Sequence, residues 1–307
     1  MTRYTRYVRA LTAAAVLGAI LTGCGGGGSG PAPAAAPSGS ASSAVRSGDA
    51  ARAGDAAPAR SSPSPRPDAV AGPPTLAPGP GGLAPVFTRG APDAGKTVAL
   101  TFDADMTADQ GPRAASGERF DNPSLIALLR RLDVPSTVFM TGRWAEEYPA
   151  QAKEIGNDPL FEIANHSYSH YAFTADCYGL PVIGEQRAAS DVRRAFTAFR
   201  EAGARNVVPY FRFPGGCYDK AALRALAPTG VTAVQWDVVS GDAFATDADA
   251  VAEQVLAGVK PGSLVVLHCT RSAAPVTEDA IRRIVPELRE RGYRFVKVST
   301  LMRKTGR

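Results

Sequence analysis

The sequence predicts an α/β fold over residues 93–307, with a parallel sheet or barrel and helices outside it. Short apolar runs rich in β-branched residues alternate there with amphipathic segments, a pattern typical of parallel strands joined by helices. Polar motifs follow several of these runs, as expected for sites at the C-terminal ends of strands. The predicted strands are residues 97–102, 136–140, 161–165, 209–213, 231–238, 263–268 and 294–298. The predicted helices are residues 122–132, 144–156, 184–202, 219–227, 247–259 and 277–291.

The first 24 residues have the pattern of an export signal. Three arginines precede an apolar stretch, residues 10–21, which is shorter than the ~20 apolar residues that span a bilayer. It ends in Leu-Thr-Gly-Cys, and Cys24 thereby resembles the cysteine of a bacterial lipobox, which carries the lipid. We expect an extracytoplasmic lipoprotein, anchored to the cell membrane through Cys24. An ordinary secretion signal with an incidental cysteine is the alternative.

Residues 25–92 are dominated by Gly, Ala, Pro and Ser. Because few large apolar side chains are available to offset the entropy of ordering, we expect a disordered linker. The charges divide at the same place: residues 1–96 hold nine Lys/Arg and four Asp/Glu, which leaves 25 of each sign in the remainder. The predicted domain is therefore neutral overall, and nucleic acid is not supported as a partner.

The chain contains three histidines, and each lies in a motif at the end of an apolar run. His166 and His170 follow one run and His268 ends another, while a carboxylate pair, Asp103 and Asp105, follows a third. Imidazole and carboxylate groups ligate metal ions and move protons. Two imidazoles and a carboxylate at one end of a sheet leave metal positions open for water, as in a catalytic zinc site. The pattern predicts metal-assisted hydrolysis, with zinc as the favoured ion and cobalt or nickel also acceptable.

Five motifs occur in a fixed order along the domain: Thr101–Asp103, His166–His170, Arg212–Gly216, Trp236–Asp242 and Leu267–His268. Together they resemble the motifs of polysaccharide deacetylases, the NodB-homology group of carbohydrate esterase family 4. The resemblance covers nearly the whole predicted domain. It implies a distorted (β/α) barrel of about seven parallel strands and the hydrolysis of acetyl groups on sugars.

The resemblance also implies roles for individual residues. Asp103 is the expected base and His268 the expected acid, while Arg212 holds Asp103 in its ionised form and orients it. The backbone N–H of Gly215 is the expected donor to the oxyanion. The two histidines of the second motif are the expected metal ligands.

Two motifs depart from the family pattern. The family usually has two consecutive aspartates in the first motif, the second of them a metal ligand, whereas this chain has Asp103-Ala104-Asp105. Since residues i and i+2 share a face of a strand, we expect Asp105 to replace the missing ligand; otherwise two histidines hold the ion. In the fourth motif, Asp237 is the first choice as the carboxylate partner of His268, and Asp242 is the second.

Three cysteines are left in the domain once Cys24 is assigned to lipid. Cys177 and Cys217 each lie in a loop just after a motif, so we expect a disulfide between them, which an extracytoplasmic location permits. Cys269 continues an apolar strand and is expected to be buried.

The sequence therefore predicts a metal-dependent hydrolase that removes acetyl groups from a polysaccharide. The partner is an acetylated glycan, with peptidoglycan favoured because the tether holds the domain beside the wall; chitin oligomers and O-acetylated xylan fit the same site. We expect a monomer that contacts the membrane through its lipid. A catalytically weak wall-binding lipoprotein and a non-haem iron oxygenase, which also uses two histidines and a carboxylate, are the alternatives.

Overall fold

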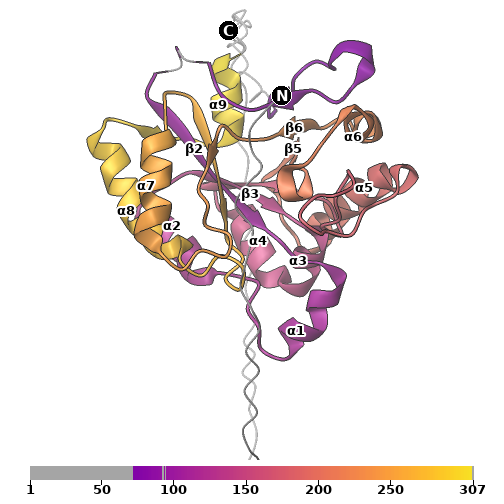
Figure 1. Ribbon diagram of the computed structural model, residues 1–307, viewed down its shortest axis with the longest axis horizontal. Coiled ribbons are helices and arrows are strands. Elements are labelled where there is room, and N and C mark those ends of the chain that lie inside the picture. The colour runs from indigo at the N-terminus through magenta and orange to yellow at the C-terminus, as the bar shows by residue number, and fades with distance from the viewer. Residues whose placement is uncertain (1–71, 92, 94, 306–307) are drawn as a thin grey trace, which may run out of the picture. The chain divides into compact units, whose positions relative to one another are not determined.

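The computed structural model describes residues 72–91, 93 and 95–305, so the predicted export signal and Cys24 lie outside the described residues. The described part holds a nine-stranded parallel sheet in the order β1-β6-β5-β4-β3-β2-β8-β7, with β9 pairing the start of β2. Helices flank the sheet (Figure 1). The strands are β1 (Val86–Phe87), β2 (Thr97–Ala104), β3 (Ser136–Met140), β4 (Phe161–Asn165), β5 (Val207–Phe211), β6 (Thr232–Val234), β7 (Val238–Val239), β8 (Ser263–His268) and β9 (Arg294–Phe295).

The helices cover the sheet with their apolar faces, and α7 and α8 lie side by side in Figure 1. Asp219 and Asp247 cap α6 and α7 with their side chains, and Asn122 caps α2. No helix in the described part of the chain is long and apolar enough to cross a membrane. The helices are α1 (Gly111–Ala115), α2 (Pro123–Arg131), α3 (Gly142–Glu147), α4 (Pro149–Asn157), α5 (Glu185–Glu201), α6 (Lys220–Leu226), α7 (Ala248–Gly258), α8 (Thr277–Glu290) and α9 (Val298–Thr305).

Strand β2 lies at the centre of the sheet, and all eight of its residues are buried. It pairs with β3 on one side and β8 on the other, which places Asp103 level with Phe139 and His268. A strand covered on both faces must be apolar or carry satisfied polar groups. The polar side chains of β2 are buried, so polar or charged partners must lie on the face of the sheet to which these side chains point.

The predicted fold class is confirmed, with differences at several element boundaries. The predicted strand 231–238 is two strands: β6 pairs β5 and β1, while β7 pairs β8 on the far side of the sheet. The predicted helix 144–156 is divided at Tyr148–Pro149 into α3 and α4, because proline at the first helical position starts a new helix.

The predicted boundary of the linker at residue 92 is wrong, because residues 72–91 pack on the domain. Val86 and Phe87 form an edge strand paired with β6, and the Phe87 side chain is buried. Farther upstream, the Leu76 N–H donates to Thr232 Oγ1 at 3.1 Å, and the Tyr210 hydroxyl donates to the Pro74 carbonyl at 2.8 Å. The rest of the predicted linker, residues 25–71, lies outside the described residues.

Phe87 provides a test of this packing. Phe87→Ala should lower the free energy of unfolding by about 3 kcal/mol, the lower end for a buried phenylalanine, since β1 is an edge strand. Urea unfolding followed by circular dichroism measures the change, with the exposed neighbour Thr88→Ala as the control. Equal stability of the two variants would contradict the packing of β1.

Candidate active site

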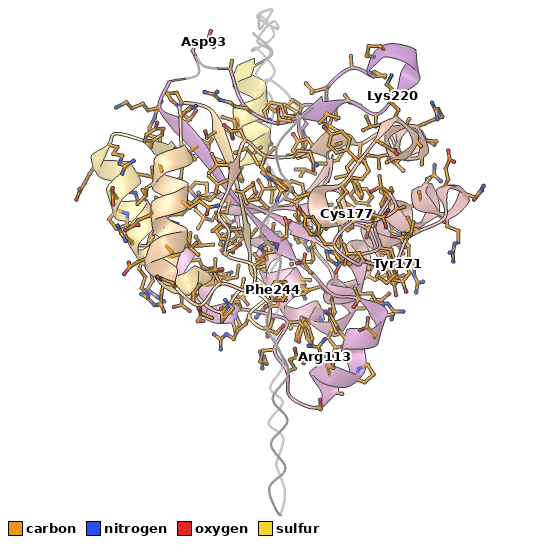
Figure 2. The ribbon with its side chains drawn as sticks, viewed as in Figure 1. Asp93, Arg113, Tyr171, Cys177, Lys220 and Phe244 are labelled. Atoms are coloured by element: carbon orange, nitrogen blue, oxygen red, sulfur yellow. A yellow bond between two sulfur atoms is a disulfide. The ribbon has the colours of Figure 1, made fainter. Side chains whose placement is uncertain are left out.

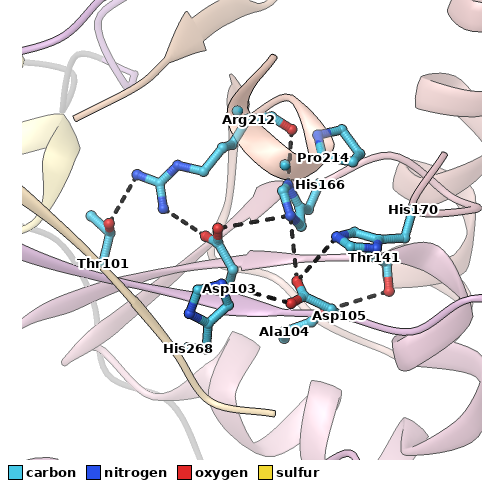
Figure 3. A network of polar contacts seen from close by, with 12 residues as sticks. Thr101, Asp103, Ala104, Asp105, Thr141, His166, His170, Arg212, Pro214 and His268 are labelled. Carbon is cyan, nitrogen blue, oxygen red and sulfur yellow. Dashed lines mark hydrogen bonds and ion pairs between the residues drawn. The ribbon is translucent and has the colours of Figure 1, made fainter. Parts of the chain in front are cut away.

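The C-terminal ends of β2, β4, β5 and β8 bring the sequence motifs together at one edge of the sheet (Figure 3). Asp103 and His268 are paired residues of neighbouring strands, and His166 directly follows β4. Arg212 directly follows β5 and reaches back across the sheet toward β2. Four stretches that are distant in sequence thus meet because parallel strands end at the same edge.

Asp105, His166 and His170 form a cluster whose ligating atoms all lie within 4.8 Å of one another. Asp105 Oδ1 is 3.3 Å from His166 Nε2 and 3.6 Å from His170 Nε2. Figure 3 shows both imidazoles directed at the Asp105 carboxylate, and Ala104 apart from them. The structure therefore brings Asp105, rather than Ala104, to the two histidines.

The ring nitrogens of His166 have separate roles. Nδ1 lies 2.9 Å from the Arg212 carbonyl oxygen and must donate its proton there, because a carbonyl only accepts. Nε2 is then unprotonated in the neutral ring, and its lone pair faces Asp105 Oδ1, a buried atom with no hydrogen-bond donor among the described residues. Converging lone pairs of one carboxylate and two imidazoles fit a divalent cation, and a second hydrogen bond that fixes the tautomer is usual for metal-bound histidine.

Without a cation, these charges shift the pKa values of the cluster. Burial favours the neutral form of Asp105, but the surrounding histidines, His170 first, outweigh it and hold the pKa of Asp105 below its ordinary value. Burial lowers the pKa of His170 to about 4. Near neutral pH Asp105 is thus ionised and His170 unprotonated, the forms that bind a metal ion. Burial lowers the pKa of His166, but the carboxylates of Asp103 and Asp105 outweigh burial and raise it above its ordinary value, so metal binding at His166 competes with a proton.

The segment between the two histidines is held by side-chain hydrogen bonds. Asn165 Oδ1 accepts from the Ser167 N–H at 2.8 Å, and Ser167 Oγ accepts from the His170 N–H at 2.9 Å. Ser167 and His170 both have positive φ angles, 67° and 57°, which are uncommon for residues other than glycine. These bonds offset the cost of that backbone, which turns both imidazoles toward Asp105.

Arg212 is fully buried and joins β5 to the polar face of β2. Its Nη1 donates to Asp103 Oδ1 at 2.6 Å, and its Nη2 donates to Thr101 Oγ1 at 2.8 Å. The guanidinium lies 3.9 Å from the centre of the Phe139 ring. Burial lowers the pKa of Arg212 below its ordinary value, and the carboxylate of Asp103 offsets only part of this effect. The other oxygen, Asp103 Oδ2, lies 3.7 Å from His166 Nε2, so Asp103 presents it to the metal cluster.

His268 lies on the other side of Asp105 and pairs with Asp242. Its Nδ1 is 2.8 Å from Asp242 Oδ1, its backbone N–H donates to Asp242 Oδ2 at 2.7 Å, and its Nε2 lies 4.0 Å from Asp105 Oδ2. Burial lowers the pKa of this imidazole, but the charge of Asp242 outweighs burial and raises it to about 10. His268 is therefore protonated near neutral pH and directs Nε2–H into the site.

The prediction that Asp237 partners His268 is wrong. The β7–β8 register pairs Val238 with Val265, so Asp237 lies beside Leu264, at the opposite end of β8 from His268. There it accepts hydrogen bonds from the Ser263 hydroxyl at 2.8 Å and the Leu264 N–H at 2.6 Å. The error follows from treating residues 231–238 as one strand that ends at the site, whereas Asp237 precedes a new strand.

A disulfide joins Cys177 and Cys217, as predicted, and Cys269 is buried and free. The disulfide ties the segment after His170 to the turn after Arg212, and Cys177 is labelled in Figure 2. Gly215 lies in that turn with φ 65°, and a Cβ there would approach Cys177 Sγ to 2.6 Å. Glycine at this position is thus required by the backbone and by the disulfide.

Three residues that support the site were not identified from the sequence: Ser240, Thr270 and Thr277. Asp242 also accepts hydrogen bonds from the hydroxyls of Ser240 and Thr277, at 2.8 and 2.7 Å. The Asp105 N–H donates to Thr270 Oγ1 at 2.9 Å. The Ser-Gly-Asp run at residues 240–242 was a usable signal, because serine and aspartate two residues apart commonly stabilise a turn. The threonines gave no signal, since they come from distant segments.

Residues 90–234 match the model of the polysaccharide deacetylase family. A chitooligosaccharide deacetylase of Sinorhizobium fredii is 28% identical, over 61% of this chain and 86% of that protein. A peptidoglycan-N-acetylglucosamine deacetylase of Bacillus cereus is 27% identical, over 69% of this chain and 91% of that protein. The structure of a family 4 carbohydrate esterase from Streptomyces lividans, in complex with acetate, superposes with a TM-score of 0.53 at 26% identity, over 66% of this chain and 92% of that chain.

The pairing of His268 with Asp242 leads to a measurable pKa change. Asp242→Asn removes the negative charge, so the pKa of His268 should fall from about 10 toward the ordinary 6.5. An NMR pH titration of the metal-free chain measures it, with Asp237→Asn as the control that leaves this pKa in place. Because the folded-state pKa exceeds 6.5, the pair stabilises the fold below that pH, and the contribution is lost as the pH rises through about 10. An unchanged His268 pKa in Asp242→Asn would contradict the assignment.

The cluster of Asp105, His166 and His170, the candidate metal site, leads to a second test. Asp105→Ala should lower zinc affinity by more than roughly 100-fold, because loss of an outer-shell partner alone costs 10–100-fold. Titration with a competing chelator measures the affinity. Asp133→Asn is a control, since Asp133 is an exposed carboxylate in the turn before β3, at the other end of the strands. Wild-type affinity in Asp105→Ala would leave the two histidines as the only protein ligands.

Proposed function

We propose that this chain is a metal-dependent hydrolase that removes acetyl groups from an N-acetylated glycan. The comparisons support a polysaccharide deacetylase domain of carbohydrate esterase family 4, and the homologues are chitooligosaccharide and peptidoglycan-N-acetylglucosamine deacetylases. Neither the wall-binding lipoprotein nor the iron oxygenase is favoured by these findings. The observation that carries the proposal is the placement of Asp103 and protonated His268 around the cluster of Asp105, His166 and His170.

Asp105, His166 and His170 would hold a divalent cation, for which we propose zinc, although the same donor set accepts cobalt or nickel. When bound, that ion supplies Lewis acidity and lowers the pKa of water. The chain's own residues provide the proton transfers. Asp103 accepts the proton of the attacking water, and the guanidinium of Arg212 fixes that carboxylate in place.

The departing amine needs a proton as the C–N bond of the acetamide breaks. His268 donates it from Nε2, and the negative charge of Asp242 keeps the imidazole charged until then. The backbone N–H of Gly215, in the turn after Arg212, is the proposed donor to the oxyanion. The reaction adds water across the C–N bond: the oxygen of water enters acetate, and a proton is transferred to the amino group of the sugar. No redox partner is required.

Peptidoglycan is the proposed substrate, and the bacterial membrane the proposed location. The relative from Bacillus cereus acts on peptidoglycan by its name, and the export signal ending at Cys24 would place a lipid-anchored domain outside the cytoplasm. Chitin oligomers have the same acetamide and are the second substrate to test, as the name of the Sinorhizobium relative indicates.

Acetate release tests the reaction. The chain with zinc should release acetate from glycan strands of peptidoglycan, lose this activity with a chelator and regain it when zinc returns. Asp103→Asn should retain zinc but lose roughly 10²–10⁴-fold in kcat, the usual contribution of a general base, while Asp133→Asn stays at the wild-type rate. No acetate from either glycan with zinc bound would refute the proposal, and an active Asp103→Asn would remove Asp103 as the base.

A further inference from the structure

A cavity of about 340 Å³ lies beside the metal cluster on the side of α3 and α5. Its lining comes from both helices and from the loops after β2 and β4, the same loops that carry the metal-binding residues. Ser169 and Tyr171, which line it, flank His170 in the sequence, and Tyr171 is labelled in Figure 2. The cavity is therefore formed in part by the loop that carries His170.

The lining is positively charged. Arg143, Arg187 and Arg194 face one carboxylate, that of Asp191. Asp191 is already engaged, because its Oδ2 accepts from the N–H groups of Tyr168 and Ser169 at 2.8 and 3.3 Å. In the described part of the chain, no ion pair joins any of the three arginines to a carboxylate, whereas Arg282 and Arg283 of α8 both have such partners. The cavity thus has a surplus of positive charge available to a ligand.

Two polar atoms in the lining are buried and have no hydrogen-bond partner among the described residues, Arg143 Nε and Ser169 Oγ. Leaving a buried polar atom unpaired is unfavourable, because it has lost water without gaining a partner. An acceptor-rich group in the cavity would pair with both. This observation is independent of the charge and points to the same class of ligand.

Two of the three arginines, Arg143 and Arg194, are positioned by an aromatic ring rather than by carboxylates. The guanidinium carbon of Arg194 lies 3.6 Å from the centre of the Tyr168 ring, and that of Arg143 lies 5.1 Å from it. The Tyr168 hydroxyl donates to Glu146 at 2.6 Å, which fixes the ring. Stacking uses the flat face of a guanidinium and leaves its N–H groups at the edge, in the geometry that binds a carboxylate with two hydrogen bonds.

We propose that this cavity is a carboxylate-binding subsite for the glycan whose acetyl group is hydrolysed at the metal cluster. The inference rests on the proposed function and narrows it to an acidic glycan. Peptidoglycan strands carry a free carboxylate on the lactyl ether where the peptide is absent, and carboxylates on the peptide stem where it is attached through that lactyl group; chitin oligomers and xylan backbones carry none. The subsite selects the first kind of polymer and sets it in register with the acetamide.

The central comparison is between peptidoglycan strands with and without their carboxylate charge. The ligands are peptide-free peptidoglycan strands, the same strands with their carboxylates converted to amides, strands that retain their peptides, and N-acetylglucosamine oligomers. Equilibrium binding to the zinc-loaded chain and acetate release are both measured. The wild type should bind the carboxylate strands about fivefold or more tightly than the amidated strands, and added salt should reduce this difference.

Arg187 is the residue to change first, because it is exposed and its removal is not expected to disturb the core. Arg187→Ala should lower affinity and kcat/KM for carboxylate strands about fivefold relative to amidated strands, and Arg187→Lys should keep part of the preference. Arg194→Ala should act in the same direction. Arg200→Ala removes a charge from the same helix outside the cavity, so it serves as the matched control.

The outcomes separate this inference from the proposed function. Equal binding of charged and amidated strands by the wild type, or an Arg187→Ala effect that is the same on both, overturns the subsite. Acetate released from none of the ligands refutes the proposed function, while the binding comparison still decides whether the cavity recognises a carboxylate. Tighter binding of peptide-bearing than of peptide-free strands assigns the carboxylate to the peptide, tighter binding of peptide-free strands assigns it to the lactyl ether, and equal binding means that the subsite accepts either carboxylate.

Discussion

The buried guanidinium of Arg212 is the interaction on which the site depends. A fully buried charge is costly unless it is paired and hydrogen-bonded, and Arg212 meets this need with Asp103, Thr101 and the Val234 carbonyl. The backbone carbonyl of the same residue accepts the Nδ1 proton of His166. One residue at the end of β5 therefore fixes both the orientation of the proposed base and the tautomer of a proposed metal ligand. Replacing Arg212 or Asp103 with an uncharged residue would leave the charge of the other residue buried and unpaired.

The remaining side chains are positioned by loops that are held from several directions. The segment from Asn165 to His170 is bonded to itself and, through Asp191, to α5. The disulfide of Cys177 ties the next part of this loop to the turn after Arg212. Sites on loops become precise when supporting hydrogen bonds fix the loop. The same network also fixes Tyr168 and the arginines stacked on it, so the metal cluster and the charged cavity share one support.

The sequence predicted the residues of the site better than their partners. Strand ends are visible as apolar runs that stop at polar residues, which is why Asp103, His166 and His268 were placed at one edge of the sheet. The partner of His268 depends on strand register, and a break in the extended conformation near Trp236 separates β6 from β7. No local pattern signals that break, because Gln235, Trp236 and Asp237 alternate in polarity like a continuing strand. Strand β1 was missed for a related reason, since two residues within a Pro- and Gly-rich stretch give no periodicity.

Strand alternation explains why the acidic residue stands at position 105. Val98, Leu100, Phe102 and Ala104 all face the main hydrophobic cluster, whereas Thr101 and Asp103 face Arg212 on the opposite side. A carboxylate at position 104 of this strand would project into apolar side chains and lose its hydration without a partner. Asp105 has the same parity as Asp103, and with its N–H held by Thr270 it reaches both histidines. In this chain the strand that continues through residue 104 therefore favours a carboxylate at position 105, one position later than in the family pattern, for the proposed metal site.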